Sequence, residues 1–496
     1  MLYTSTRDKS IRVTSSEAIT RGISAEGGLF VPEQIPSLSK EDIERLSKLD
    51  YRGRAKEVLS LYLTDFTKEE IDSCVDGAYA DGKFSSSETA PLVALSDGTQ
   101  ILELWRGPTC AFKDMALQLL PYLLTVSAGK TANGKQIVIL VATSGDTGKA
   151  ALEGFKDVPN TKIMVFYPSD GVSPMQKLQM ATQEGGNVAV CAIEGNFDDA
   201  QSGVKKIFTD PAVAAKLAEK NMMFSSANSI NWGRLVPQVV YYVSAYCDLI
   251  AKGVVRNGDS INVTVPTGNF GNILAAYYAK MMGVPIKTLI CASNKNKVLT
   301  DFIETGVYDR RRDFYCTSSP SMDILISSNL ERLLFLMSGM DDVKTAGWMK
   351  ELSENGVYDI GSEMLGKIKA LFCGGYCDEE ETKSLIAEVF SRDNYLCDTH
   401  TAVGVKVYNN YKEATGDATP TVVASTASPY KFSKSVLEAV SPDENLNDEF
   451  DMVERLHEIT GFECPEQLLS LRSKSVRFRE CCKRDEMEEA MLKIML

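Results

Sequence analysis

Residues 136–149 are QIVILVATSGDTGK, and this stretch decides the fold class. It begins with a short apolar run, Gln136–Ala142, whose β-branched residues favour a buried strand. A tight loop of small and hydroxyl-bearing residues follows, and a helical segment begins after it. A strand that leads through a short loop into a helix is typical of a βαβ unit, and it therefore predicts a mostly parallel sheet.

The same rhythm recurs along the chain from about residue 98 onward. Five further apolar runs are each followed by a small-residue loop and a helical segment: Lys162–Tyr167, Asn187–Ile193, Ile261–Pro266, Ile286–Ala292 and Thr419–Ser425. Six such runs, spread over this length of chain, favour an α/β protein with two lobes over one continuous sheet.

The two ends of the chain differ from this core. The first 90 residues are mixed and contain two amphipathic helical patterns, Lys40–Leu49 and Lys68–Ala80, the second with Thr67 as its N-cap. The residues after Val440 are charged and periodic, which predicts helices. The expected parts are an N-terminal α+β domain (1–90), a two-lobed core (91–440, smaller lobe about 120–225) and a C-terminal helical tail (441–496).

Composition and charge narrow the functional classes. The 496 residues carry a net charge of −14, which disfavours nucleic acid and anionic membranes as partners. The N-terminus has no apolar signal core, and the twelve cysteines have no framework spacing, which favours a reduced, cytoplasmic protein. The apolar stretch 235–255 contains Gln238, Asp248 and Lys252, so it predicts a buried helix rather than a membrane span.

Histidine and cysteine give little support to hydrolytic or metal chemistry. The chain has only His400 and His457, so imidazole is not expected to be its main catalytic group. Cys373 and Cys377 resemble half of a zinc site, but no second pair has a ligand-like spacing. We therefore expect no metal.

One lysine is a candidate for covalent chemistry. In residues 104–114, LWRGPTCAFKD, a Gly-Pro turn leads into an apolar helix with Lys113 near its N-terminal end. The helix dipole and the apolar neighbours Phe112 and Met115 favour a neutral amine, which Schiff-base chemistry requires. Taken alone, a solvated lysine on a helix surface is the more common situation.

Three polar loops at expected helix starts are suited to anions. Residues 143–149, TSGDTGK, are not a nucleotide P-loop, because Thr143 replaces a required glycine and alanine follows Lys149. Residues 265–272, VPTGNFGN, contain two glycines that let the backbone approach an anion. Residues 228–234, NSINWGR, combine amide, hydroxyl and guanidinium groups. Each loop alone also has an ordinary structural explanation, such as a strand-to-helix turn or an N-capped helix, but together they indicate an α/β enzyme that handles phosphate.

Seven motifs in order give the chain a family resemblance: GPTCAFKD, ATSGDTGKA, GNFDDAQ, NSINWGR, PTGNFGN, SPSMDI and HTAVG. With YTSTR and GGLFVP near the start and STASPYKF near residue 430, the chain resembles the threonine synthases over nearly its whole length. The resemblance implies a tryptophan-synthase-like fold and the cofactor pyridoxal 5'-phosphate. The implied reaction converts O-phospho-L-homoserine and water to L-threonine and phosphate. The implied protein is a monomer or homodimer with a small-molecule substrate.

The resemblance also implies roles for individual residues. Lys113 stands where the family's Schiff-base lysine stands, and Thr426 matches the hydroxyl partner of the pyridine nitrogen. A neutral hydroxyl at that nitrogen moderates the electron sink. The implied cofactor-binding residues are Lys113, Asp146, Gly268, Asn269, Phe270, Gly271, Asn272 and Thr426. The implied substrate-binding residues are Thr143, Ser144, Thr147, Asn228, Ser229 and Arg234, the last three for the substrate phosphate.

The chain departs from the common family pattern at Arg106, Thr399, Ser428 and Tyr430. These departures leave open a threonine-synthase-like phospholyase, which releases phosphate without completing the hydration. A serine or threonine dehydratase of the same fold is a further alternative, although such an enzyme needs no pocket for a γ-phosphate. The alternative from another class is a non-catalytic scaffold that binds pyridoxal phosphate.

Overall fold

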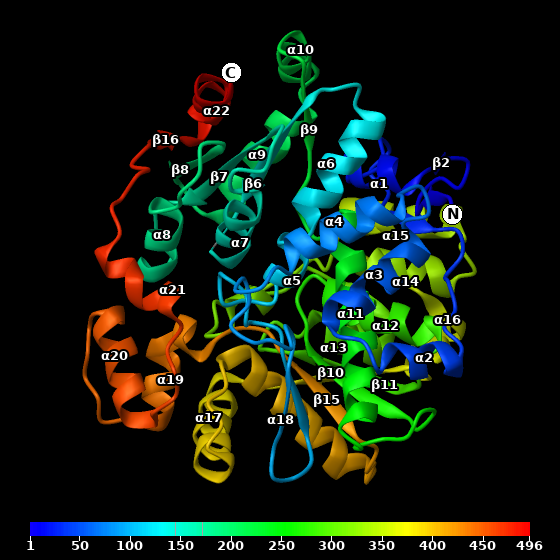
Figure 1. Cartoon of the computed structure of the whole chain (residues 1–496), viewed down its shortest axis with the longest axis vertical. Helices are drawn as coiled ribbons and strands as arrows, with labels where there is room; N and C mark the ends of the chain where they lie inside the picture. Colours follow the sequence, from blue (N-terminus) through cyan, green and yellow to red (C-terminus); the bar gives the residue numbers. More distant parts are fainter. Residues whose placement is uncertain (144, 171) are drawn as a thin grey trace.

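A six-stranded sheet forms the larger lobe in the computed structural model, which describes residues 1–143, 145–170 and 172–496 (Figure 1). Its strand order is β14 (Phe372–Tyr376), β11 (Ile286–Ser293), β10 (Ile261–Pro266), β15 (Thr421–Ser425), β5 (Gln100–Glu103) and β4 (Leu92–Ala94). All neighbours are parallel except β4, which is antiparallel to β5. The helices packed against this sheet include α12 (Gly271–Met282), α13 (Val298–Thr305) and α18 (Thr399–Thr415).

A five-stranded parallel sheet forms the smaller lobe. Its order is β16 (Cys481–Lys483), β8 (Val188–Glu194), β7 (Thr161–Pro168), β6 (Gln136–Ala142) and β9 (Met222–Ser225). The helices α7 (Asp146–Phe155), α9 (Phe197–Thr209) and α10 (Pro211–Glu219) pack against these strands, and α8 (Pro174–Ala181) packs against α7. All six predicted runs are strands, so the prediction of two parallel-sheet lobes is confirmed.

The C-terminal tail is only partly helical. Helices α20 (Glu449–Thr460), α21 (Glu466–Leu469) and α22 (Met487–Met495) are present as expected. Between them, β16 pairs with β8 at the edge of the smaller sheet, so the prediction of a wholly helical tail is wrong. Three residues are too few to show a period in the sequence, and only the pairing with β8 makes them a strand.

The N-terminal region combines a small antiparallel sheet with helices. Strands β1 (Tyr3–Ser5), β2 (Arg12–Val13) and β3 (Phe30–Pro32) are followed by α2 (Lys40–Leu46), α3 (Tyr51–Tyr62) and α4 (Lys68–Ala78), and α1 (Ser15–Arg21) lies between β2 and β3. The Thr67 side chain accepts a hydrogen bond from the Glu70 N–H, and the Glu70 carboxylate accepts one from the Thr67 N–H. This reciprocal capping confirms the predicted start of α4. The domain boundary at residue 90 stays a prediction.

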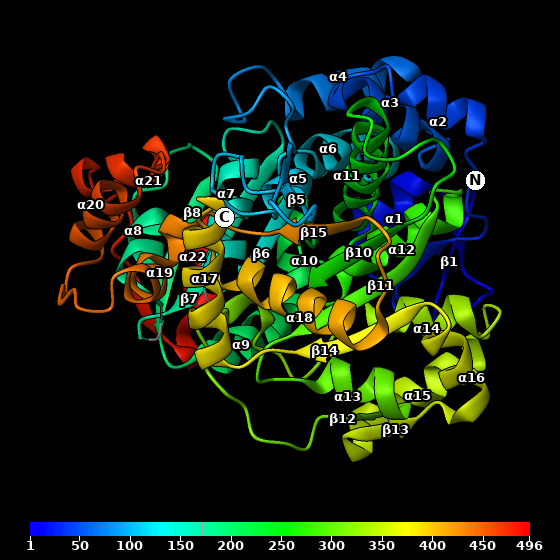
Figure 2. The ribbon, with the colours of Figure 1, turned by 90° about the horizontal axis from the view of Figure 1, so that it is seen from below.

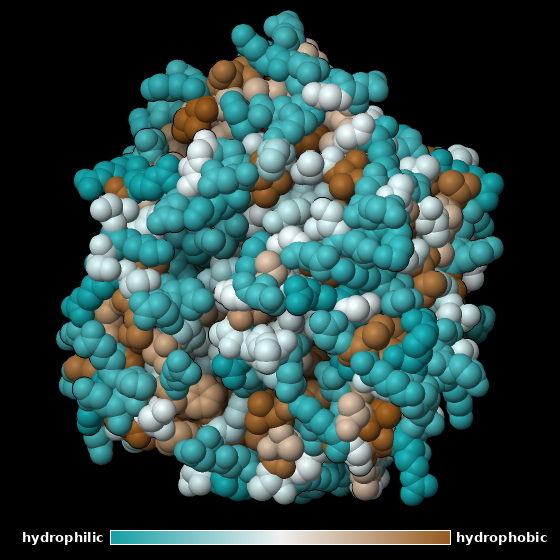
Figure 3. Space-filling view, in the orientation of Figure 1, coloured by the Kyte–Doolittle hydropathy of each residue, from teal (hydrophilic) through white to brown (hydrophobic). Residues whose placement is uncertain are grey.

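The long apolar segment is a buried helix, α11 (Trp232–Ala251). It packs against α3, α12 and α5 (Asp114–Leu117), as expected for a helix that is apolar on nearly every side. In the part of the chain that the structure describes, no helix has both the length and the apolar character that a membrane span needs. Figure 3 shows a mainly hydrophilic surface on one face, with apolar side chains in small separate patches.

The remaining elements surround these lobes. They are α6 (Leu120–Thr131), β12 (Val307–Asp309), α14 (Leu330–Met337), α15 (Asp342–Asn355), β13 (Val357–Asp359), α16 (Gly361–Lys369), α17 (Glu379–Asp393) and α19 (Ser433–Val440). Three neighbouring strands of the larger sheet, β10, β15 and β5, place their carboxyl ends on one edge (Figure 2). Loops that follow such ends are where α/β proteins bind ligands. Lys113, the 268–272 loop and Thr426 follow these three strands, whereas the predicted loops 143–147 and 228–234 follow β6 and β9 of the smaller sheet.

Candidate active site

Lys113 lies between β5 and the short helix α5, with its side chain buried. Its Nζ lies 3.0 Å from Ser321 Oγ and 3.5 Å from Asp146 Oδ2. Burial is the largest cause that lowers the pKa of the Lys113 amine; Asp146 opposes it, and the positive charges of Lys431 and Arg234 reinforce it. The sequence predicted this lowering from two causes, the helix dipole and the apolar neighbours of Lys113. A helix of four residues has a small dipole, so burial is the better explanation.

Asp146 lies at the start of α7 between two lysines. Its Oδ1 is 2.6 Å from the Nζ of Lys431 and accepts a hydrogen bond of 3.2 Å from Gln176 Nε2, while its Oδ2 faces Lys113. Burial disfavours the ionised carboxyl, but the charges of Lys431 and Lys113 outweigh burial and hold the pKa of Asp146 below its usual range. The carboxylate therefore stays ionised inside the protein.

The loop after β6 is folded by its own threonine. Thr143 Oγ1 accepts hydrogen bonds from the N–H groups of Gly145 (3.0 Å) and Gly148 (2.9 Å). Gly145 has φ +149°, which glycine adopts without strain. Thr147 is half-buried on the first turn of α7. Ser144, the remaining predicted residue of this loop, lies outside the described residues.

The loop after β10 presents unpaired donors. Among the described residues, the N–H groups of Gly268, Asn269 and Phe270 find no acceptor. Phe270 has φ +61°, a left-handed conformation that is uncommon outside glycine and clusters at ligand-binding sites. Asn272 follows in the first turn of α12, and its buried Nδ2 has no hydrogen-bond partner in the same described part. Free donors at the positive end of a helix form an anion site.

Ser321 connects this loop to Lys113. A Cβ atom on Gly268 would lie 2.4 Å from the Ser321 carbonyl oxygen, so only glycine allows this approach. The Ser321 N–H donates to Nε2 of His400 (3.2 Å), and His400 Nδ1 lies 2.7 Å from an oxygen of Asp398. The sequence analysis assigned no role to these residues. The SPSMDI and HTAVG motifs that contain Ser321 and His400 were the available signal.

Arg234 is a buried cation in the first turn of α11. Its Nη1 donates to the Ala227 carbonyl (2.5 Å), while its buried Nε has no partner and its guanidinium pairs with no carboxylate among the described residues. Burial lowers the pKa of Arg234 to about 10, so the group remains charged at neutral pH. Asn228 is exposed and Ser229 half-buried in the preceding turn. The structure thus brings Arg234 close enough to act on Lys113, while Asn228 and Ser229 remain at the rim.

Thr426 follows β15 and is buried beside Lys113. Its carbonyl accepts a 2.8 Å hydrogen bond from the Phe112 N–H, and no described residue hydrogen-bonds to its hydroxyl. Among the departures from the family pattern, Ser428 has a buried hydroxyl without a described partner. Thr399 donates to the Ser318 carbonyl at 2.7 Å. The other two are engaged elsewhere: the guanidinium of Arg106 lies 2.6 Å from Glu103, and the hydroxyl of Tyr430 bonds to the Phe462 carbonyl.

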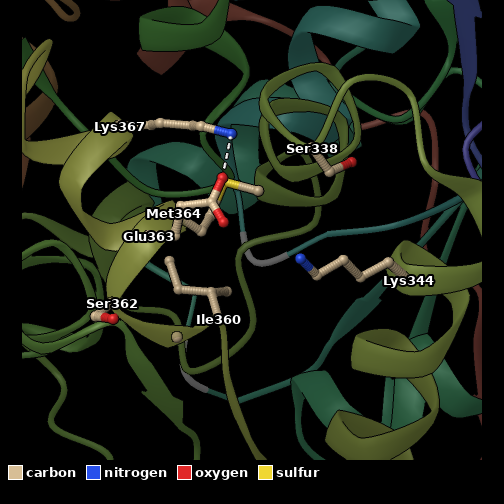
Figure 4. A pocket seen from close by; sticks show the side chains of 8 residues that line it. Ser338, Lys344, Ile360, Ser362, Glu363, Met364 and Lys367 are labelled. Carbon is tan, nitrogen blue, oxygen red and sulfur yellow. Dashed lines mark ion pairs between the residues drawn. The ribbon is translucent and has the colours of Figure 1, made fainter.

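A separate cavity lies away from these residues, between α14, α15 and α16 (Figure 4). Its volume is about 360 Å³, and its lining includes Lys344 and the pair Lys367–Glu363, which are 3.0 Å apart. None of the predicted site residues lines it. The chemistry of Lys113 therefore has no connection with this cavity.

Known proteins resemble both the sequence and the fold. Residues 2–79 match the family "Threonine synthase N terminus", and residues 401–487 match "Threonine synthase, C-terminal". Threonine synthase from Schizosaccharomyces pombe is 36% identical over 474 residues, which cover 90% of each chain. "Threonine synthase-like 1" from Homo sapiens is 41% identical over 86% of this chain, but the match covers only 58% of that longer protein.

Solved structures agree. A PLP-bound threonine synthase from Brucella melitensis has a TM-score of 0.87 at 37% identity, covering 99% of this chain and 98% of its own. Threonine synthase from yeast has a TM-score of 0.88 at 32% identity, with the same coverage. The two-lobed α/β fold is therefore the one shared by these threonine synthase structures, one of which is PLP-bound. The chain belongs to the threonine synthase family.

The residues present fit pyridoxal phosphate. The free N–H groups of 268–270 at the start of α12 and the orphaned Nδ2 of Asn272 form a cradle for a phosphate. A buried lysine with a lowered pKa lies beside them, joined through Ser321. Thr426, whose carbonyl accepts from the N–H of the residue before Lys113, offers a hydroxyl that no described residue engages. The phosphate, the aldehyde and the pyridine nitrogen of the cofactor thus each have a candidate group.

We expect Gly268→Ala to weaken cofactor binding by about tenfold or more, because its methyl group would displace the Ser321 carbonyl and with it the loop. Gly347→Ala on α15 is the matched control, since a Cβ there would meet nothing within 4 Å. The measurement is the dissociation constant of pyridoxal phosphate by fluorescence titration. Equal affinities in the two variants would contradict the role of Gly268.

Proposed function

We propose that the chain is a threonine synthase, which converts O-phospho-L-homoserine and water to L-threonine and phosphate. The observation that carries this proposal is the pair of separate anion sites beside Lys113. The 268–272 loop suits the phosphate of the cofactor, and the uncompensated charge of Arg234 suits a second phosphate. A dehydratase of the same fold has no use for the second site.

On this proposal each residue has a defined task. The cofactor, when bound to Lys113, supplies the electron sink of the reaction. Lys113 moves protons between Cα, Cβ and Cγ of the substrate after the substrate displaces it. Thr143, Ser144 and Thr147 bind the substrate carboxylate, with Asp146 beside the cofactor ring.

The leaving group is held at the other end of the substrate. Arg234 binds the substrate phosphate, and Asn228 and Ser229 complete that site from the rim. As the Cγ–O bond breaks, negative charge grows on the phosphate, so Arg234 stabilises the transition state more than the ground state.

A phospholyase is the second candidate. The threonine synthase-like 1 relatives are 40–41% identical to this chain, whereas the threonine synthases compared above are 36% (S. pombe), 37% (B. melitensis) and 32% (yeast) identical. The changed residue Ser428 also leaves a buried hydroxyl without a described partner beside the site. A water molecule placed differently near Ser428 would favour elimination of phosphate without hydration of the product.

One assay separates the candidates. The purified chain with pyridoxal phosphate is given O-phosphohomoserine, and phosphate and organic products are both measured. Threonine formed in equal amount to phosphate supports threonine synthase, whereas phosphate with an α-keto acid and ammonia supports the phospholyase. Release of no phosphate by a chain that binds the cofactor would support a scaffold, and deamination of serine in its place would support a dehydratase.

A further inference from the structure

Lys431 is a second buried lysine in the site, and none of the roles above uses it. It belongs to the short 3-10 helix η2 (Pro429–Phe432) after β15, and its side chain is 1% exposed. Its Nζ lies 2.6 Å from Asp146 Oδ1 and donates to the Thr109 carbonyl at 3.0 Å. Lys431 thus approaches the same carboxylate as Lys113 from the opposite side.

The two lysines share this carboxylate unequally. The Lys431 contact is a direct charged hydrogen bond of 2.6 Å, while Lys113 is 3.5 Å from the other oxygen. Charge-assisted hydrogen bonds of short length are the strong ones, so Lys431 neutralises most of the Asp146 charge. Asp146 still favours the ammonium form of Lys113, but the charge of Lys431 beside the same carboxylate opposes that effect.

The other groups near the Lys113 amine do not stabilise its ammonium form as Asp146 does. Arg234 on α11 adds a second positive charge. Ser321 contributes a neutral hydroxyl, and its backbone N–H donates to His400 of α18. Asp114, the nearest acidic neighbour in the sequence, points its carboxylate at the N–H and hydroxyl of Thr109. Asp146 is therefore the anion that could stabilise the Lys113 ammonium, and Lys431 occupies it.

We propose that Lys431 is a positioning residue that engages Asp146 and so keeps the Lys113 amine available in its neutral form for covalent binding of the cofactor aldehyde. The proposal rests on the proposed function, because it concerns how Lys113 binds the cofactor. In that step the lone pair of Lys113 Nζ adds to the aldehyde carbon. The aldehyde oxygen then leaves as water with the two amine protons, and a C=N bond remains.

Removing the Lys431 charge should raise the pKa of Lys113. In Lys431→Met, Asp146 keeps Gln176 but loses its closest cation, so it pairs with Lys113 and stabilises the ammonium form. An opposite charge at such a distance moves a pKa by about one to three units, here upward. At pH 7 the neutral fraction of Lys113 should then fall by about tenfold or more, and the deficit should vanish at high pH.

The test is competitive labelling of the full-length chain with acetic anhydride between pH 6 and 11, followed by mass spectrometry of the Lys113 peptide. We expect the titration midpoint in Lys431→Met to rise by about one unit or more. Borohydride trapping of pyridoxal phosphate at Lys113 should be about tenfold slower at pH 7 and normal at high pH. Lys431→Arg should keep the native midpoint, because it retains the charge.

Two further variants make the result decisive. Asp146→Asn removes the shared anion, so the Lys113 midpoint should fall, which tests the proposal even if Lys431→Met does not fold. Lys149→Met is the matched control, because this lysine lies on α7 but pairs with Glu153 at 2.9 Å. The Lys113 midpoint in Lys149→Met should equal that of the native chain.

Other outcomes would overturn the proposal. An unchanged or lower midpoint in Lys431→Met, or an unchanged or higher one in Asp146→Asn, excludes control of Lys113 by this ion pair. A trapping rate reduced by the same factor at every pH would make Lys431 a structural residue or a phosphate ligand. If the native chain trapped no cofactor at Lys113, the proposed function would fail, while the labelling midpoints would still decide the effect of Lys431.

Discussion

Replacing Lys113 with alanine should abolish covalent cofactor binding and lower turnover of O-phosphohomoserine by at least about a thousandfold. Loss of a single positioned proton carrier reduces rates by about 10² to 10⁴, and this variant also loses the covalent attachment point. The expectation depends on a buried amine with a lowered pKa that lies next to the 268–272 loop. The measurement is borohydride reduction followed by mass spectrometry, with phosphate release measured in parallel.

Lys149→Ala is the control for this experiment. Lys149 lies on the neighbouring helix α7, and its Nζ is 2.9 Å from Glu153, so its loss should leave the reduced cofactor on Lys113. A pyridoxyl group found on Lys431 in the native chain would show that the wrong lysine has been assigned. A pyridoxyl adduct that still forms on borohydride reduction of Lys113→Ala would show the same.

Arg234→Lys should lower turnover with O-phosphohomoserine by about one to three orders of magnitude, the range typical of losing one strong anion donor. The guanidinium can bind two phosphate oxygens at once, which an ammonium cannot do. Among the described residues Arg234 has no carboxylate partner, so its charge is available to a ligand. Cofactor binding and any slow deamination of serine should be largely unaffected, since they do not use the second phosphate site.

Arg106→Lys tests whether Arg106, rather than Arg234, binds the substrate phosphate. Arg106 lies over the Trp105 ring and pairs with Glu103 at 2.6 Å, so its charge is already compensated and its replacement should change turnover little. Steady-state kinetics with O-phosphohomoserine and with serine provide the comparison. Full activity of Arg234→Lys together with a large loss in Arg106→Lys would move the phosphate site to Arg106.

The strands found in the sequence and the strands missed there differ in a simple physical way. Runs such as Gln136–Ala142 and Ile261–Pro266 are buried on both faces, so their apolar character is visible locally. Strand β14 has the sequence FCGGY, and two glycines disfavour a strand in isolation. It is a strand because it pairs with β11 in register over five residues. Edge strand β16 likewise depends on a partner that is distant in the sequence.

The sequence by itself determined the parallel sheets, the loops at the carboxyl ends of their strands and, through the motifs, the family. These are local properties, because each strand, loop and helix start is encoded in adjacent residues. Only the tertiary structure decided which groups meet inside the site. Lys431 and Ser321 have no pattern around them that predicts a contact with Asp146 or Lys113, yet they lie 2.6 Å and 3.0 Å from these residues. The ionisation of Lys113 follows from burial and from the distances to neighbouring charges, and both exist only once the two lobes have folded together.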